Sequence, residues 1–364
     1  MSGNRPTLAQ VARHSGVSVS TASLAFSQGG RITPETRERV LAAAKDLGYS
    51  GPNPLGRQLR SGKCGIIGVV LGANPGRAFS DPVAVQVLDG LVTDLGEAGL
   101  GALFIPGLAG DSLVASAPMD AAILVWGAIE DDPNLPMLQR RNIPIAVGEG
   151  PQIPGTSLVG VEDQAGMRAA VQHLVDLGHT RIAEVTLALR MHDENATGEF
   201  VPEDLVTGTT RASAGHRAAG FREVIQPVVT WEAPGSTVEG GRVAAHAILD
   251  LPADQRPTAI VAQSDMLAAG VILGLRDRGL TPGEDISVVG FDGIDLPWLA
   301  PWVLTSVRQP LREKGENLAK AVLNLIDGGA PTEVYLPAEL VIGNTTAPPK
   351  SQPPVDPDTF GWSW

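Results

Sequence analysis

The stretch TLAQVARHSGVSVSTASLAF, Thr7–Phe26, decides how the N-terminal part of the chain folds. Thr7 is a suitable N-cap, and apolar residues follow it at helical spacing. Gly16 then breaks the helix, and Ser18 can cap a second one. One face of that second helix carries Ala22, Ala25 and Phe26, and the other carries Val19, Ser20, Ser23 and Leu24. Two short helices joined by a tight glycine turn predict a helix-turn-helix.

A third helix and an uneven charge distribution support this prediction. Thr33 is a suitable N-cap, Pro34 stands at the first helical position, and Gly48 follows the last turn. The chain has a net charge of −13, which alone would argue against a nucleic-acid partner. Residues 1–63, however, hold nine Lys and Arg against three Asp and Glu, a net charge of +6, and the remainder carries −19. This asymmetry favours a DNA-contacting head on an acidic body, with a generic solvated basic end as the alternative.

The segment 7–49 resembles the DNA-binding head of the LacI-type transcription regulators, the group of the lactose and galactose repressors. Three later stretches resemble core motifs of the same family: VGVEDQAGMRAAVQHLVDLGHTRIA (159–183), SDMLAAGVILGLRDRGLTPGEDISVVGFDGIDLP (264–297) and LTSVRQPLREKGENLAKAVLNLI (304–326). Their order along the chain matches the family. The resemblance implies an effector-responsive transcription regulator, a repressor foremost. It would bind a pseudo-palindromic DNA operator as a homodimer, with a tetramer as the alternative.

The resemblance also implies which head residues meet DNA. Val19, Ser20 and Leu24 match the positions that touch base edges, and relatives commonly have Arg at the third. This chain therefore lacks the bidentate arginine–guanine contact that supplies ~1–3 kcal/mol of discrimination. We expect Val19 and Leu24 to contact thymine methyl groups; the alternative is that both pack inside the head. The other predicted DNA-contacting residues of the head are Thr7, Leu8, Ser18, Ser23, Arg31 and Thr33.

Residues 51–63 are predicted to form a hinge, because Asn53–Lys63 resembles the hinge helix of the family. Leu59 matches the leucine that two paired hinge helices wedge into the minor groove, and Arg60 can reach a phosphate. An apolar wedge reads the deformability of the duplex without hydrogen bonds to bases. The hinge is therefore expected to share the sequence readout with the head.

Beyond the hinge, short apolar strands alternate with helices, which predicts two parallel α/β subdomains. The resemblance implies a periplasmic-binding-protein-like core whose chain crosses between subdomains three times, near 161–163, 290–294 and 320–326. The expected organisation is a head at 1–50, the hinge, a first subdomain at 64–162 plus 293–322, a second at 163–292 plus 323–346, and a disordered tail at 347–364.

A small-molecule effector is expected between the subdomains, at the carboxyl ends of the strands. By resemblance, Arg217, Asp265 and Asp292 match ligand-pocket positions of one subdomain, and Trp126 and Glu149 match those of the other. Acids, an arginine and an aromatic ring suit a sugar. Asp265 could instead cap the helix that follows it.

Two features leave alternatives open for the effector. Pro82-Val83-Ala84 stands where relatives often have Pro followed by two aromatics, which weakens a nucleobase ligand without excluding a non-sugar effector. The segment 190–210 is longer than the corresponding family loop, and it is predicted to be either a lid over the cleft or an inert surface loop.

Other functional classes are disfavoured. There is no GxSxG elbow, no phosphate-binding loop and no HExxH motif, so no enzyme is expected, and neither a cofactor nor a metal site is predicted. No apolar run approaches the ~18 residues of a membrane span. The N-terminus lacks an apolar signal core and Cys64 is the single cysteine, which indicates a cytoplasmic protein. An intracellular solute-binding protein of the same core fold remains the second hypothesis, which the head disfavours.

Overall fold

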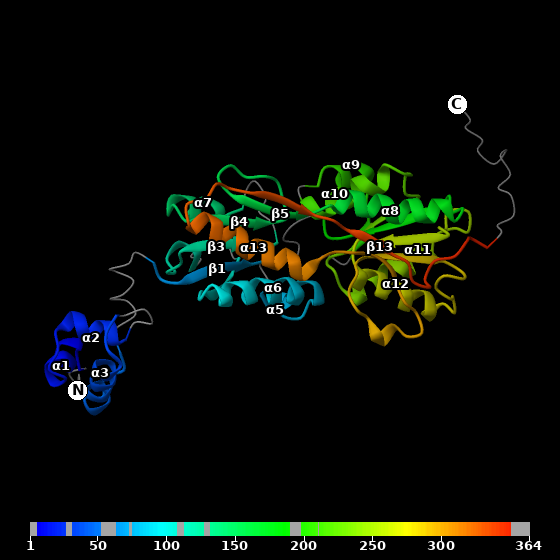
Figure 1. Cartoon of the computed structure of the whole chain (residues 1–364). Helices are drawn as coiled ribbons and strands as arrows, with labels where there is room; N and C mark the ends of the chain where they lie inside the picture. Colours follow the sequence, from blue (N-terminus) through cyan, green and yellow to red (C-terminus); the bar gives the residue numbers. More distant parts are fainter. Residues whose placement is uncertain are drawn as a thin grey trace, which may run out of the picture. The chain divides into compact units, whose positions relative to one another are not determined.

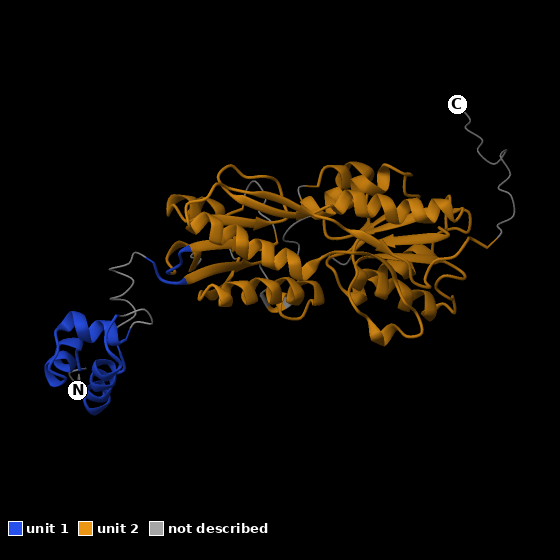
Figure 2. Cartoon of the chain, viewed as in Figure 1, with its two compact units in different colours: residues 1–65, 118–120 blue, residues 66–117, 121–364 orange. Residues whose placement is uncertain are grey.

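The computed structural model describes residues 6–26, 31–51, 63–72, 75–107, 113–126, 132–189, 198–209 and 211–350. The chain forms two compact units (Figure 2): residues 1–65 with 118–120, and residues 66–117 with 121–364. Within the described part of the chain, no helix has both the length and the apolar character that crossing a membrane requires.

The described residues of the first unit form three helices, α1 (Leu8–His14), α2 (Val19–Ala25) and α3 (Pro34–Asp46). All three predicted N-caps are confirmed: the side chains of Thr7, Ser18 and Thr33 each accept a hydrogen bond from a backbone N–H three residues later. Small side chains let the helices approach closely around a core of Val11, Ala12, Ala22, Ala25, Val40, Ala43 and Ala44. The predicted three-helix head is therefore confirmed.

The second unit, the core, contains two sheets (Figure 1). The first is entirely parallel, in the order β12-β5-β4-β3-β1-β2. Its strands are β1 (Ile66–Leu71), β2 (Gly101–Pro106), β3 (Ala121–Leu124), β4 (Ile145–Gly148), β5 (Ser157–Val161) and β12 (Glu333–Leu336). The central strands are buried on both faces, as expected for parallel strands covered by helices.

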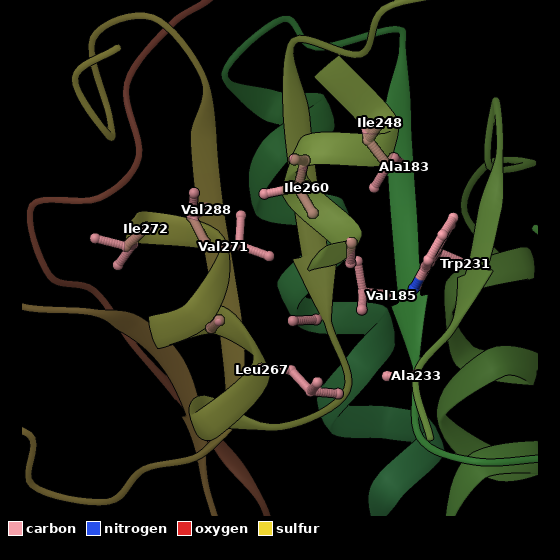
Figure 3. Close-up of a cluster of buried hydrophobic side chains, with 14 of the residues drawn as sticks. Ala183, Val185, Trp231, Ala233, Ile248, Ile260, Leu267, Val271, Ile272 and Val288 are labelled. Carbon is pink, nitrogen blue, oxygen red and sulfur yellow. The ribbon is translucent and has the colours of Figure 1, made fainter. Parts of the chain in front are cut away.

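The second sheet has the order β13-β11-β10-β9-β6-β8-β7, and only its two edge strands are antiparallel to their neighbours. Its strands are β6 (Ile182–Thr186), β7 (Glu199–Phe200), β8 (Thr230–Glu232), β9 (Ala259–Ala262), β10 (Ser287–Asp292), β11 (Thr305–Arg308) and β13 (Glu339–Val341). One face packs against α11 and α12 (Figure 3), and the other packs against α8. We call the two halves of the core the first and second lobes.

Helices cover both sheets and include two short 3-10 segments. They are α5 (Pro75–Ala78), α6 (Pro82–Glu97), η1 (Leu113–Ala115), α7 (Leu135–Arg140), α8 (Asp163–Asp176), α9 (Glu203–Thr207), α10 (Ala212–Arg222), α11 (Val238–Leu249), α12 (Asp265–Asp277), η2 (Pro297–Leu299) and α13 (Leu311–Ile326).

Glycines set the closest helix contacts. A Cβ on Gly90 of α6 would lie 2.1 Å from the carbonyl oxygen of Arg312, and one on Gly315 of α13 would lie 1.9 Å from that of Val87. These two helices can pack this closely because glycine lets backbone meet backbone.

The chain crosses between the lobes three times, as predicted, but two of the positions were wrong. The crossing after β5 is where it was expected. The crossing expected at 290–294 falls between β11 and α13 instead, because β11 pairs with β10 and keeps the chain in the second lobe. The crossing expected at 320–326 falls between β12 and β13, because β12 joins β5 in the first sheet.

The lobe boundaries change accordingly. Residues 293–308 belong to the second lobe and 323–336 to the first, which corrects the predicted subdomain limits. The predicted tail also begins later than expected: the Ala347 carbonyl accepts hydrogen bonds from Ser287 Oγ and His179 Nε2, and Lys350 forms an ion pair with Asp285. The rest of the tail, 351–364, lies outside the described residues.

Candidate DNA-binding surface and effector cleft

The outer face of α2 presents the residues predicted to read bases. Val19 is 50% exposed and Leu24 is 40% exposed, while Ala22 and Ala25 on the opposite face are buried. Thr7, Ser18, Ser20, Arg31 and Thr33 are also exposed, and Leu8 and Ser23 are half-buried. The alternative that Val19 and Leu24 pack inside the head is therefore wrong. Leu59 and Arg60 of the predicted hinge lie outside the described residues.

In the core, Arg217 of α10 is the centre of a buried ionic cluster in the second lobe. Its Nε donates to Asp163 Oδ1 at 2.8 Å, and its Nη1 lies 3.7 Å from Asp292 Oδ1. The guanidinium also lies over the Phe291 ring, 3.8 Å from its centroid. Arg217, Asp163 and Asp292 are each only 4% exposed in their side chains. The two carboxylates thus hold the arginine in one orientation, as its planar donor fork allows.

Asp292 ends β10 with a φ of 133°, in a region that L-residues rarely adopt. Gln309 donates to Asp292 Oδ1 at 2.7 Å and fixes its side chain. Backbone strain of this kind is found at functional sites, where the surrounding structure has to maintain it.

Asp265 is fully buried behind this cluster. Its carboxylate accepts hydrogen bonds from Ser306 Oγ at 2.5 Å and from the Ile294 N–H at 2.8 Å, so both oxygens are occupied. The N-cap of α12 is Ser264, and Asp265 occupies the first helical position instead. In this structure Asp265 braces the loop after β10, and a direct contact with an effector stays a prediction.

The first lobe supplies a second ion pair. Lys314 of α13 donates to Glu149 Oε1, and its Nζ lies 5.8 Å from the centroid of the Trp126 ring. The Lys314 side chain is fully buried, whereas that of Glu149 is 15% exposed. The structure therefore brings two predicted residues, Trp126 and Glu149, together around Lys314, which no sequence motif indicated.

A small pocket lies where the lobes meet. The first lobe contributes Glu149, Gly150, Gly160, Val161 and Tyr335, and the second contributes Asp163, Ala212, Ser213 and His216. Trp126, Arg217, Asp265 and Asp292 do not line this pocket, although Arg217 lies directly behind Asp163. A ligand in the pocket would touch both lobes.

Burial and the two cations together set the protonation of the acids. Burial raises the pKa of Asp163, and the Arg217 charge opposes this only in part. Burial likewise raises the pKa of Asp292 well above its usual value and that of Asp265 to about 6. For Glu149, burial is outweighed by Lys314 and Arg217, and its pKa is lowered. Among the described residues, no cluster of acids, histidines and cysteines could hold a metal ion.

The described part of the long segment 190–210 packs onto the second lobe. Arg222 of α10 makes two hydrogen bonds to Glu203 of α9, at 2.5 and 2.8 Å, and a third, at 2.7 Å, to the fully buried Glu184. Val206 of α9 is buried, and β7 pairs with β8. Residues 198–209 are therefore packed onto the second lobe, which argues against an inert loop, while the alternative of a lid stays a prediction.

The small helical head with an exposed reading helix, joined to a two-lobed core with a polar pocket between the lobes, defines a ligand-responsive DNA-binding protein. Residues 7–53 match the bacterial regulatory proteins of the lacI family, and residues 171–346 match the periplasmic binding protein-like domain. An HTH-type transcriptional regulator of Mycolicibacterium smegmatis is 32% identical over 362 residues, covering 95% of this chain and 97% of the relative.

Solved structures agree over the same length. The Lac repressor dimer bound to operator and the anti-inducer ONPF aligns with a TM-score of 0.76 at 25% identity, over 94% of this chain and all of the other. A complex of the transcriptional regulator CelR with cellobiose aligns with a TM-score of 0.64 at 25% identity, over the same shares. The chain belongs to the LacI family of bacterial regulatory proteins and is a DNA-binding transcriptional regulator rather than an enzyme.

Proposed function

We propose that this regulator is a repressor that binds a pseudo-palindromic operator as a dimer and responds to a sugar-like effector in the cleft between its lobes. The observation that carries the DNA-binding part is the exposed face of α2, with Val19, Ser20 and Leu24 in the positions that meet bases in a helix-turn-helix. A dimer places two such helices on successive half-sites. Because its target is chromosomal DNA, we place the protein in the cytoplasm.

The effector part rests on the pocket that both lobes line and on the ion pairs at its walls. Carboxylates that are already oriented can accept hydrogen bonds from neighbouring hydroxyl groups of a sugar. Closure of the lobes around such a ligand would change their relative orientation, which is the signal that reaches the head. The cellobiose in the CelR complex is an example of this ligand class in a relative.

In a direct test, the purified full-length protein is used to select bound duplexes from a random DNA library. The most enriched sequence is then titrated with the protein by gel shift. We expect one specific site with inverted half-sites, and an affinity that falls steeply as salt rises, because bound phosphates release counterions. The control is a chain that lacks residues 1–63. Equal binding by that shortened chain would refute the proposal.

A further inference from the structure

Lys314 is the least expected charged group in the core. It lies in the first turns of α13, its side chain has no exposed surface, and its ammonium group is held between the Glu149 carboxylate and the Trp126 ring. Taking an ammonium group out of water is costly unless a counter-charge accompanies it. Lys314 is therefore paired with Glu149, which lines the pocket between the lobes, whereas Lys314 does not line it.

The backbone at Glu149 is unusual as well. Its φ is 65°, in the left-handed region that favours glycine, and it stands between Gly148 and Gly150. A glycine at this position would remove the backbone strain, but it would also remove the carboxylate. An acidic side chain held in such a conformation points to a functional role for that carboxylate.

A similar arrangement faces Glu149 from the second lobe. Asp163 lines the same pocket, and the buried Arg217 stands behind it just as Lys314 stands behind Glu149. Each wall thus lines the pocket with an acidic residue, and the cation paired with that residue does not line it. A ligand between them meets hydrogen-bond acceptors on both sides, and an anionic group on the ligand would have to compete with these carboxylates for Arg217 and Lys314.

We propose that Lys314 is a specificity-determining residue of the effector cleft. By holding Glu149 opposite Asp163, it selects an uncharged polyhydroxylated ligand, whose hydroxyl groups donate to both carboxylates, and it excludes anionic sugars. The proposal rests on the proposed function of the cleft as the effector site. To that function, the proposal adds selection of neutral over anionic sugars and a role for Lys314, which does not line the pocket itself.

The first experiment is a thermal-shift comparison of matched sugars on the full-length protein. The probes are D-glucose and cellobiose on one side, and D-glucuronate and glucose 6-phosphate on the other. We expect a neutral sugar to raise the Tm and its anionic counterpart to leave it unchanged. A larger shift with an anionic sugar, or no shift with either neutral one, would overturn the proposal. Operator binding is measured separately, so a failure of the selection of neutral over anionic sugars is distinguishable from a failure of the DNA-binding function.

The second experiment needs no effector. Glu149→Gly relieves the left-handed backbone and leaves Lys314 without its carboxylate. We expect sodium acetate to raise the Tm of this variant more than sodium chloride of equal ionic strength does. The same difference should be absent in the wild type and in Glu149→Gly combined with Lys314→Met.

This result would mean that acetate binds Lys314 in the position of the deleted Glu149 carboxylate. Equal acetate effects in the single and the double variant, or no acetate effect in the single variant, would show that Lys314 does not hold a carboxylate at this wall. Lys320→Met serves as the matched control, because Lys320 lies on the same helix with a 60% exposed side chain.

Discussion

Leu24 and Val19 are exposed apolar side chains on the surface of α2 that we propose meets base edges. Their exposure follows from the helical period, since Ala22 and Ala25 occupy the buried face. The caps and the reading face could be predicted from the sequence because both depend on local spacing. The bases that this face would contact follow from the chemistry of the side chains. Two aliphatic side chains can recognise the methyl group of thymine and no hydrogen-bonding base edge.

Changing these contacts should change the preferred operator. Replacement of thymine by uracil at the half-site positions next to α2 is expected to weaken binding, because it deletes the methyl groups. Leu24→Arg is expected to introduce a preference for guanine at one position, of ~1–3 kcal/mol. Repeated library selection with the variant measures both effects. An unchanged consensus in the variant would mean that α2 only positions the head and that bases are read elsewhere.

Asp265 makes the free energy of unfolding of the core depend on pH, and the direction of that dependence follows from its pKa. Its pKa is about 6 in the folded protein and near 3.8 when unfolded, so the folded state binds the proton more tightly. The stabilisation is complete below the unfolded value and is lost as pH rises through about 6, on the order of 3 kcal/mol in total. We expect the free energy of unfolding to increase from pH 7 to pH 5, and Asp265→Asn to remove part of that slope. Denaturant unfolding at both values checks this, and an identical slope in wild type and variant would contradict it.

At the scale of elements, most strands could be predicted from apolar runs bounded by turn residues. The lobe to which each strand belongs could not. β11 and β12 are both four residues long, and their sequences TSVR and EVYL do not encode which sheet they join. β11 pairs with β10, and β12 pairs with β5, from which more than a hundred residues separate it in the sequence. A local sequence pattern does not contain the information for such a choice of partner.

The contact of α6 with α13 offers a test on one helix. Gly90→Ala places a Cβ against the Arg312 carbonyl, so we expect a loss of at least ~1–3 kcal/mol as the helices are pushed apart. Gly96→Ala on the same helix meets nothing within 4 Å and should stabilise by ~0.5–1 kcal/mol through helix propensity. Chemical denaturation of both variants provides the comparison. Similar effects of the two substitutions would show that the close packing is not needed.

At the scale of the whole molecule, the cleft joins residues that the sequence keeps far apart. Glu149 could be assigned to it from a motif with a family resemblance, whereas Arg217 and Asp292, assigned in the same way, do not line the pocket. Lys314 could not, because a lysine in an amphipathic helix is normally a solvated residue. Only the packing of α13 against the first lobe places it beside Glu149.

Arg217→Lys should separate ligand sensing from folding. The charge between Asp163 and Asp292 is kept, but the planar donor fork is lost, so we expect the response of operator affinity to a bound sugar to fall by ~1–3 kcal/mol. Gel shifts with and without the sugar measure this for the wild type, the variant and Arg168→Lys, an exposed control. A response as large as that of the wild type would place the effector outside this cleft.

The order in which the strands join their sheets also determines when each part of the protein can be finished during synthesis. The head is complete once residue 51 has left the ribosome. The first lobe begins at β1, yet it lacks α13 and its edge strand β12 until residue 336 has emerged. A nascent chain therefore carries a complete helical head for most of its synthesis, while the first lobe, which lines the proposed effector pocket, is completed only at the last stage.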